Sequence, residues 1–78
     1  MLAKKLKAKF LKEHKETLRE VLKKRNRVDI VADEGIELFL REEEKDYREN
    51  WDEWIGDGTK FNTEIFLYNI YCDYIEGH

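Results

Sequence analysis

The residues that could do chemistry in this chain are few. Its 78 residues include two histidines, one cysteine and no serine. We expect Cys72 to lie on the apolar face of a helix, where a cysteine usually behaves as a small hydrophobic residue. A cysteine nucleophile needs a neighbouring base or cation, and His14 is expected at the edge of an apolar helix face while His78 stands at the end of the sequence. The residue types therefore predict no Cys–His catalytic pair.

Carboxylates are more numerous, but their spacing predicts no metal site. Glu42, Glu43 and Glu44 are consecutive, and successive helical side chains point about 100° apart, so they cannot converge on one ion. Asp29 and Asp33 could converge, yet a hard cation prefers six or more oxygen ligands. The four glycines are scattered rather than gathered in a phosphate-binding loop. We therefore expect a non-enzymatic protein with no cofactor and no metal.

The strongest signal is the division of charge along the chain. Residues 1–28 carry eleven Lys or Arg and three Glu, a charge of +8, whereas residues 29–78 carry four Lys or Arg and fifteen Asp or Glu, a charge of −11. The basic and acidic halves can neutralise each other within the fold or across a dimer. Alternatively, one or both can stay exposed and attract partners of opposite charge. The sequence leaves both arrangements open.

Periodicity predicts a basic amphipathic helix over residues 2–25. Its apolar residues recur at multiples of four: Leu2, Leu6, Phe10, Leu18 and Leu22. Basic residues crowd its last turn, where the helix dipole favours them, and also its first turns, where the dipole disfavours them. Basic residues placed against the helix dipole do not stabilise the helix, so their position can indicate a function.

The next segment permits two structures. Residues 27–41 could form a β-hairpin around a Gly35-containing turn, which would make the fold α+β. A longer apolar pattern instead favours an acidic helix over about 33–55, with Asp29 as another possible start: Ile36, Leu40, Tyr47, Trp51 and Trp54. We expect the helix and keep the hairpin as the alternative.

A turn is predicted at Gly56-Asp57-Gly58-Thr59. Beyond it, a buried helix over about 62–76, capped by Asn62 or Thr63, follows from apolar residues spaced by three and four: Phe61, Ile65, Tyr68, Cys72 and Ile75. The expected fold is therefore a single all-α domain of two long antiparallel helices plus a buried C-terminal helix.

Composition bounds the compartment and the partners. A single cysteine fits a reducing compartment, and the basic start is not followed by the apolar stretch of a secretory signal. The longest apolar run, residues 65–75, falls far short of the roughly 20 residues that span a bilayer. A chain this short buries a marginal core, which makes a homo-oligomer plausible. We expect a cytoplasmic protein with no membrane partner.

Aromatic residues interleaved with acids predict a protein-binding surface in the second half. Tyr and Trp anchor many protein interfaces, and an acidic surround selects a basic partner, such as a nucleic-acid-binding protein. The sequence thus predicts a small acidic inhibitor or adaptor with these partner-binding residues: Glu43, Glu44, Asp46, Tyr47, Trp51, Asp52, Glu53 and Trp54.

Nucleic-acid binding through the basic helix is the alternative function. A row of cations can neutralise several phosphates and give salt-sensitive, sequence-independent affinity. Against it, the aromatic residues that would stack on bases lie in the acidic half, whose fifteen acids would repel a polyanion. The binding residues in this alternative are Lys4, Lys5, Lys9, Lys12 and Lys23.

Overall fold

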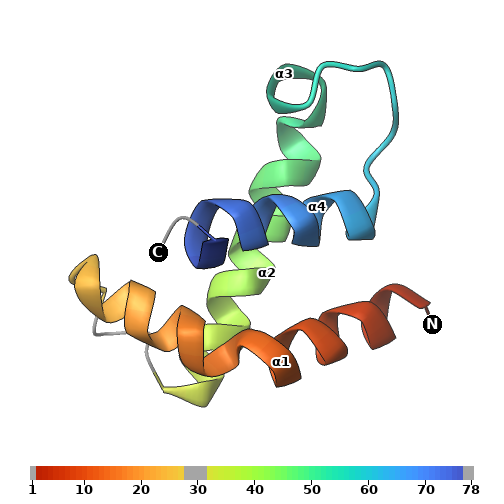
Figure 1. Cartoon of the computed structure of the whole chain (residues 1–78). Helices are drawn as coiled ribbons and strands as arrows, with labels where there is room; N and C mark the ends of the chain where they lie inside the picture. Colours follow the sequence, from red (N-terminus) through yellow and green to blue (C-terminus); the bar gives the residue numbers. More distant parts are fainter. Residues whose placement is uncertain (1, 28–31, 77–78) are drawn as a thin grey trace.

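All regular structure in the described part of the chain, residues 2–27 and 32–76 of a computed structural model, is helical (Figure 1). The elements in order are α1 (Leu2–Lys24), α2 (Asp33–Glu49), α3 (Trp51–Trp54), α4 (Thr63–Ile70) and the π-helical segment η2 (Tyr71–Glu76). The all-α expectation is confirmed. The hairpin alternative is wrong for residues 33–41, which lie in α2, while residues 28–31, including the alternative helix start at Asp29, fall outside the described residues.

Asn26 ends α1 rather than capping α2. Its φ is 62°, a left-handed conformation that Asn tolerates better than most residues. The Arg27 amide donates to the Leu22 carbonyl at 2.8 Å, and the Asn26 amide donates to the Lys23 carbonyl at 3.0 Å. This pair of hydrogen bonds is a Schellman motif, which satisfies carbonyls that a helix end leaves without partners.

The expected acidic helix is interrupted at Asn50. α2 ends at Glu49, and α3 follows as a single turn. Asn50 adopts φ −115° and ψ 19°, and both its backbone amide and its side-chain amide donate to the Asp46 carbonyl at 3.0 and 2.9 Å. Both amide groups of Asn50 thus bond to the same carbonyl at the end of α2. The segment that was expected to be one helix up to Ile55 is therefore two helices, α2 and α3.

The turn and the cap that precede the last helix are confirmed. Gly56 and Gly58 have φ of 66° and 81°, a region that glycine enters without steric cost. The Asn62 side chain accepts a hydrogen bond from the Ile65 amide at 3.2 Å, so Asn62 is the N-cap of α4. α4 and η2 together cover the helix expected over 62–76.

The buried face of this last helix differs from the expected stripe. Phe66, Leu67 and Ile70 are buried, whereas Tyr68 is 66% exposed. All four of these residues lie in α4, before η2 begins. Because α4 packs along α1, the side of α4 that carries Phe66, Leu67 and Ile70 meets the core, and the side that carries Tyr68 does not.

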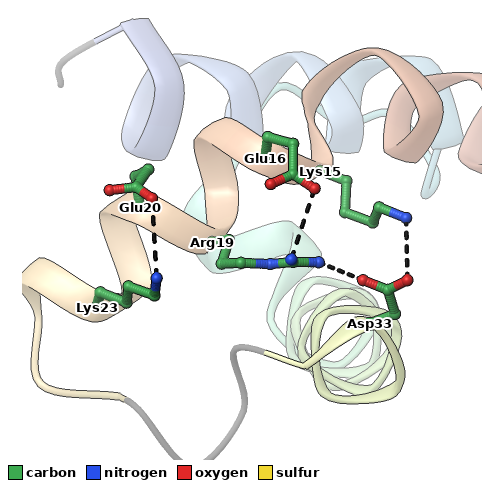
Figure 2. Close-up of polar contacts among 6 residues, drawn as sticks. All are labelled: Lys15, Glu16, Arg19, Glu20, Lys23 and Asp33. Atoms are coloured by element: carbon green, nitrogen blue, oxygen red, sulfur yellow. Dashed lines mark hydrogen bonds and ion pairs between the residues drawn. The ribbon is translucent and has the colours of Figure 1, made fainter.

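α2 crosses α1 steeply, which corrects the expected antiparallel alignment of the two long helices. Figure 1 shows α4 and η2 running along α1 in the same direction, while α2 passes across them; in Figure 2 α2 is viewed nearly end-on where α1 runs across the view. The core lies where these elements meet, and its fully buried side chains are Leu18, Leu22, Ile36, Phe39, Phe66 and Ile70. The crossing leaves α3 at the end of α2 that is remote from α1.

Candidate interaction surfaces

Two of the aromatic residues predicted to bind a partner belong to the core. Tyr47 is 7% exposed and Trp51 is 5% exposed. The Tyr47 ring meets Phe66 with centroids 5.1 Å apart, and Trp51 donates its indole N–H to the Thr59 hydroxyl at 3.3 Å. The prediction that Tyr47 and Trp51 lie on the binding surface is therefore corrected, because a small domain with few other large apolar residues needs both to fill its core.

Trp54 is the exposed aromatic residue of the predicted set. Half of its surface, 51%, is exposed. Its ring also packs against Tyr47 in a T-shaped contact with centroids 5.1 Å apart and an interplanar angle of 85°. An indole that is held on one side by the core and open on the other has the form of an interface anchor.

Carboxylates gather in the segment that carries Trp54. Asp46, Asp52 and Glu53 are exposed, and within the described residues none of them forms an ion pair. Glu49, which the sequence analysis did not include, is exposed in the last turn of α2 and equally without an ion pair there. Glu49 lies three residues after Asp46 and four before Glu53, and this helical spacing could have predicted that it shares their side of the helix. Asp46, Glu49, Asp52, Glu53 and Trp54 are called the acidic corner below.

Glu43 and Glu44 serve the fold rather than this surface. Glu44 is 9% exposed and accepts hydrogen bonds from Lys7 at 2.7 Å and Arg48 at 3.1 Å. Burial acts to raise the pKa of Glu44, but the hydrogen bonds and charges of Lys7 and Arg48 hold it below its usual value. Burial raises the pKa of Glu43 and outweighs the 3.2 Å hydrogen bond from the Tyr74 hydroxyl. Both carboxylates are corrected from partner-binding to internal contacts.

The second half of α1 directs its cations toward acids of the fold (Figure 2). Lys15 reaches Asp33 at 3.2 Å, and Arg19 forms an ion pair with the same carboxylate. Lys15 and Arg19 lower the pKa of Asp33 through hydrogen bonds and charge. Lys23, one of the predicted nucleic-acid contacts, lies 3.9 Å from Glu20. The basic residues of this half are thus largely used within the chain.

Two basic residues that follow α1 cover aromatic rings. The Arg25 guanidinium lies 4.4 Å from the Tyr74 ring centroid and donates to the Asp73 carbonyl at 3.2 Å. Arg27 lies 5.9 Å from the ring centroid of Phe39. Such cation–π contacts tie the end of α1 to α2 and η2.

Four lysines in the first half of α1 stay open. Lys4, Lys5, Lys9 and Lys12 are exposed, and no acid of the described residues forms an ion pair with them. Lys5, Lys9 and Lys12 follow one another at four and three residues, so they share one side of the helix. These four residues are called the lysine face below. The charge polarity is therefore only partly neutralised within the fold.

His14 and Cys72 have separate partners. The His14 ring lies between Phe10 and Tyr71, with centroids 4.9 and 5.4 Å away, and the Cys72 thiol donates to the Glu76 carboxylate at 3.5 Å. Across residues 2–27 and 32–76, no group of three His, Cys, Asp or Glu could hold a metal ion, and no helix is both long and apolar enough to cross a membrane.

Glu44→Gln is expected to lower the free energy of unfolding at about pH 7 by roughly 1–2 kcal/mol, because a neutral amide loses the charge-assisted hydrogen bonds from Lys7 and Arg48. The pKa of Glu44 is lowered by folding, so its stabilisation is present above about pH 4 and is lost as the pH falls through the folded pKa. Urea unfolding at about pH 7 and about pH 3 should therefore show the difference from wild type shrinking in acid.

Glu43→Gln is the matched control for that measurement. Folding raises the pKa of Glu43, so its neutral form is the one the fold favours, and we expect no loss of stability from this variant at neutral pH. Equal losses in the two variants, or a Glu44→Gln loss that persists undiminished at about pH 3, would contradict the assignment of Glu44 as the internal ion-pair partner.

No protein-family model matches the chain, and neither a curated protein nor a solved structure matches it.

Proposed function

We propose that this chain is a small non-enzymatic protein-binding module, an inhibitor or adaptor of the cytoplasm, whose acidic corner docks a basic partner. The observation that carries the proposal is Trp54, half-exposed and held against Tyr47. In the same stretch of the chain, Asp46, Asp52 and Glu53 are exposed and without an ion pair in the described residues. A fixed indole among carboxylates with no internal cation suits a ligand that brings its own cations.

The chemistry of the corner favours lysine and arginine side chains. Their cations can pair with the carboxylates and can also lie over the face of the Trp54 indole, where the ring quadrupole attracts them. Exposed ion pairs contribute only about 0–1 kcal/mol each. The indole is therefore the anchor, while the carboxylates attract and orient the partner. A protein with a basic, nucleic-acid-binding face has the matching chemistry.

The double substitution Asp52→Lys with Glu53→Lys is expected to weaken capture of a fluorescein-labelled lysine-rich peptide by about tenfold at low salt, since two attractions become repulsions. Fluorescence anisotropy measures the affinity. The matched control is Glu34→Lys with Glu37→Lys, which changes the net charge equally at two exposed positions near the start of α2 and should retain most of the affinity. Trp54→Ala should also weaken capture, because it removes the anchor without changing the charge.

Two results would contradict this proposal. Equal losses in the two double variants would mean that net charge alone attracts the peptide. Unchanged affinity in both Asp52→Lys with Glu53→Lys and Trp54→Ala would mean that the peptide binds elsewhere. Circular dichroism of each variant separates these outcomes from unfolding.

Nucleic-acid binding through the lysine face is the second candidate. The exposure of Lys4, Lys5, Lys9 and Lys12 without internal acid partners supports it. The pairing of Lys23 with Glu20 shortens the basic row to the first half of α1. A shorter row neutralises fewer phosphates, so the affinity would be weaker and the salt dependence shallower than for a helix that is basic over its full length.

If the lysine face binds nucleic acid, anisotropy with labelled duplex and single-stranded oligonucleotides should show binding that weakens steeply as salt rises. Replacing Lys5, Lys9 and Lys12 with Ala should lower the slope of log affinity against log salt by about 2–3, close to one for each lost phosphate contact. No binding at low salt would rule out this second candidate and leave the lysine face free for a protein.

A further inference from the structure

Two open surfaces of opposite charge lie on the same molecule. The lysine face presents cations without an internal acid, and the acidic corner presents carboxylates without an internal cation. Other basic residues are engaged with the fold: in α1, Lys7 pairs with Glu44 and Lys15 and Arg19 pair with Asp33, and Arg25, just after α1, contacts η2. The two surfaces are thus among the charged regions that the fold leaves without ion pairs.

One copy of the chain cannot bring these surfaces together. Figure 1 shows α3 at the end of α2 remote from α1, whereas the lysine face lies on the first half of α1. α2 is fixed across α1 by the buried contacts of the core and by the ion pair between Lys7 and Glu44 at 2.7 Å. Only a second molecule can satisfy both surfaces at once.

We propose that the acidic corner binds the lysine face of a second copy of this chain. The proposal rests on the proposed function, because it names the basic partner of the same corner. Lysines at the spacing of Lys5, Lys9 and Lys12 form a row along one side of α1, which can pair with carboxylates while an ammonium group covers Trp54. Each copy offers two different surfaces, so the same contact can be made reciprocally in a two-fold dimer or can repeat head-to-tail in rings and open chains.

The groove next to the lysine face, which Lys9 also lines, fits the corner less well. Leu6, Phe10 and Leu67 line it, but so do Glu13 and Glu64. Those two carboxylates would repel the acidic corner, so an indole entering this groove would bring like charges together. Charge complementarity selects the lysine face.

Sedimentation velocity on the whole chain tests the contact with variants in which the charge of each surface is reversed. Variant A reverses the lysine face with Lys5→Glu, Lys9→Glu and Lys12→Glu. Variant B reverses the acidic corner with Asp46→Lys, Asp52→Lys and Glu53→Lys, and a third variant carries all six substitutions. Variant B has a net charge of +3 where the wild type has −3, so a loss of association in B cannot come from stronger overall repulsion. The six-substitution variant keeps the wild-type net charge and reverses the polarity of both surfaces.

At low salt the weight-average sedimentation coefficient of the wild type should rise with concentration toward about 0.5 mM, as weak pairing requires, and should return to the monomer value at about 0.5 M salt, where exposed charges are screened. Variants A and B should each stay monomeric, and the six-substitution variant should associate again. The control Glu34→Lys, Glu37→Lys and Glu76→Lys, also at +3, should associate like the wild type.

Three outcomes would overturn the contact between the acidic corner and the lysine face. A wild type that stays monomeric at low salt, while still binding the lysine-rich peptide, would refute self-association and leave the proposed function standing. A wild type that neither self-associates nor binds the peptide would refute both the contact between copies and the proposed function. Association that persists in A and in B would place the contact on another surface, such as the one around the exposed Tyr68.

Discussion

The ring of Tyr47 joins three parts of this small protein. It packs against Phe66 of α4 and Trp54 of α3, each with centroids 5.1 Å away, and its hydroxyl donates to the Asp73 carboxylate of η2 at 3.4 Å. Burial, together with the charges of Asp73 and Glu43, raises the pKa of Tyr47 to about 12, so the hydroxyl remains a donor at physiological pH. The position of Trp54, and with it the acidic corner, depends on this buried ring.

The electrostatics of the fold follow from the steep crossing of α1 and α2. Where the helices meet, acids of α2 take up cations of α1: Glu44 receives Lys7, and Asp33 receives Lys15 and Arg19. Beyond the crossing each helix extends away from the other (Figure 1), so their charges have no internal partner. The partial neutralisation of charge is therefore a consequence of this geometry: the charges in the contact zone are paired, whereas the lysine face of α1 and the acids at the far end of α2 have no ion-pair partner among the described residues.

Local signals in the sequence predicted the helices well because their causes are local. Asn26, Asn62 and the Gly56–Gly58 turn end or begin helices through hydrogen bonds and dihedral angles within a few residues. The break at Asn50 was missed, since it depends on a doubled hydrogen bond to Asp46 inside a segment with strong helical periodicity.

The candidate surface was harder to predict because exposure depends on distant neighbours. A periodic pattern places Tyr47 and Trp51 on an apolar face, but they are buried through contacts with distant residues, Tyr47 with Phe66 of α4 and Trp51 with Phe61 just before it. Glu44 is matched to Lys7, 37 residues away in sequence, and no local spacing reveals that pair. Asp46, Asp52, Glu53 and Trp54 keep their predicted place at the surface because neither α1 nor α4 covers them.

Differential quenching of tryptophan fluorescence tests most directly whether an exposed indole stands among unpaired acids. Trp51 is 5% exposed and Trp54 51% exposed, so quenchable emission should come from Trp54, with Trp54→Phe as the background. The quenching by each ion is measured at matched low ionic strength and expressed relative to the quenching by neutral acrylamide. On this relative scale we expect caesium ions to quench the Trp54 emission more strongly than iodide, because the carboxylates concentrate cations and exclude anions. Iodide quenching as strong as that by caesium, or quenching that survives unchanged in Trp54→Phe, would contradict the acidic corner.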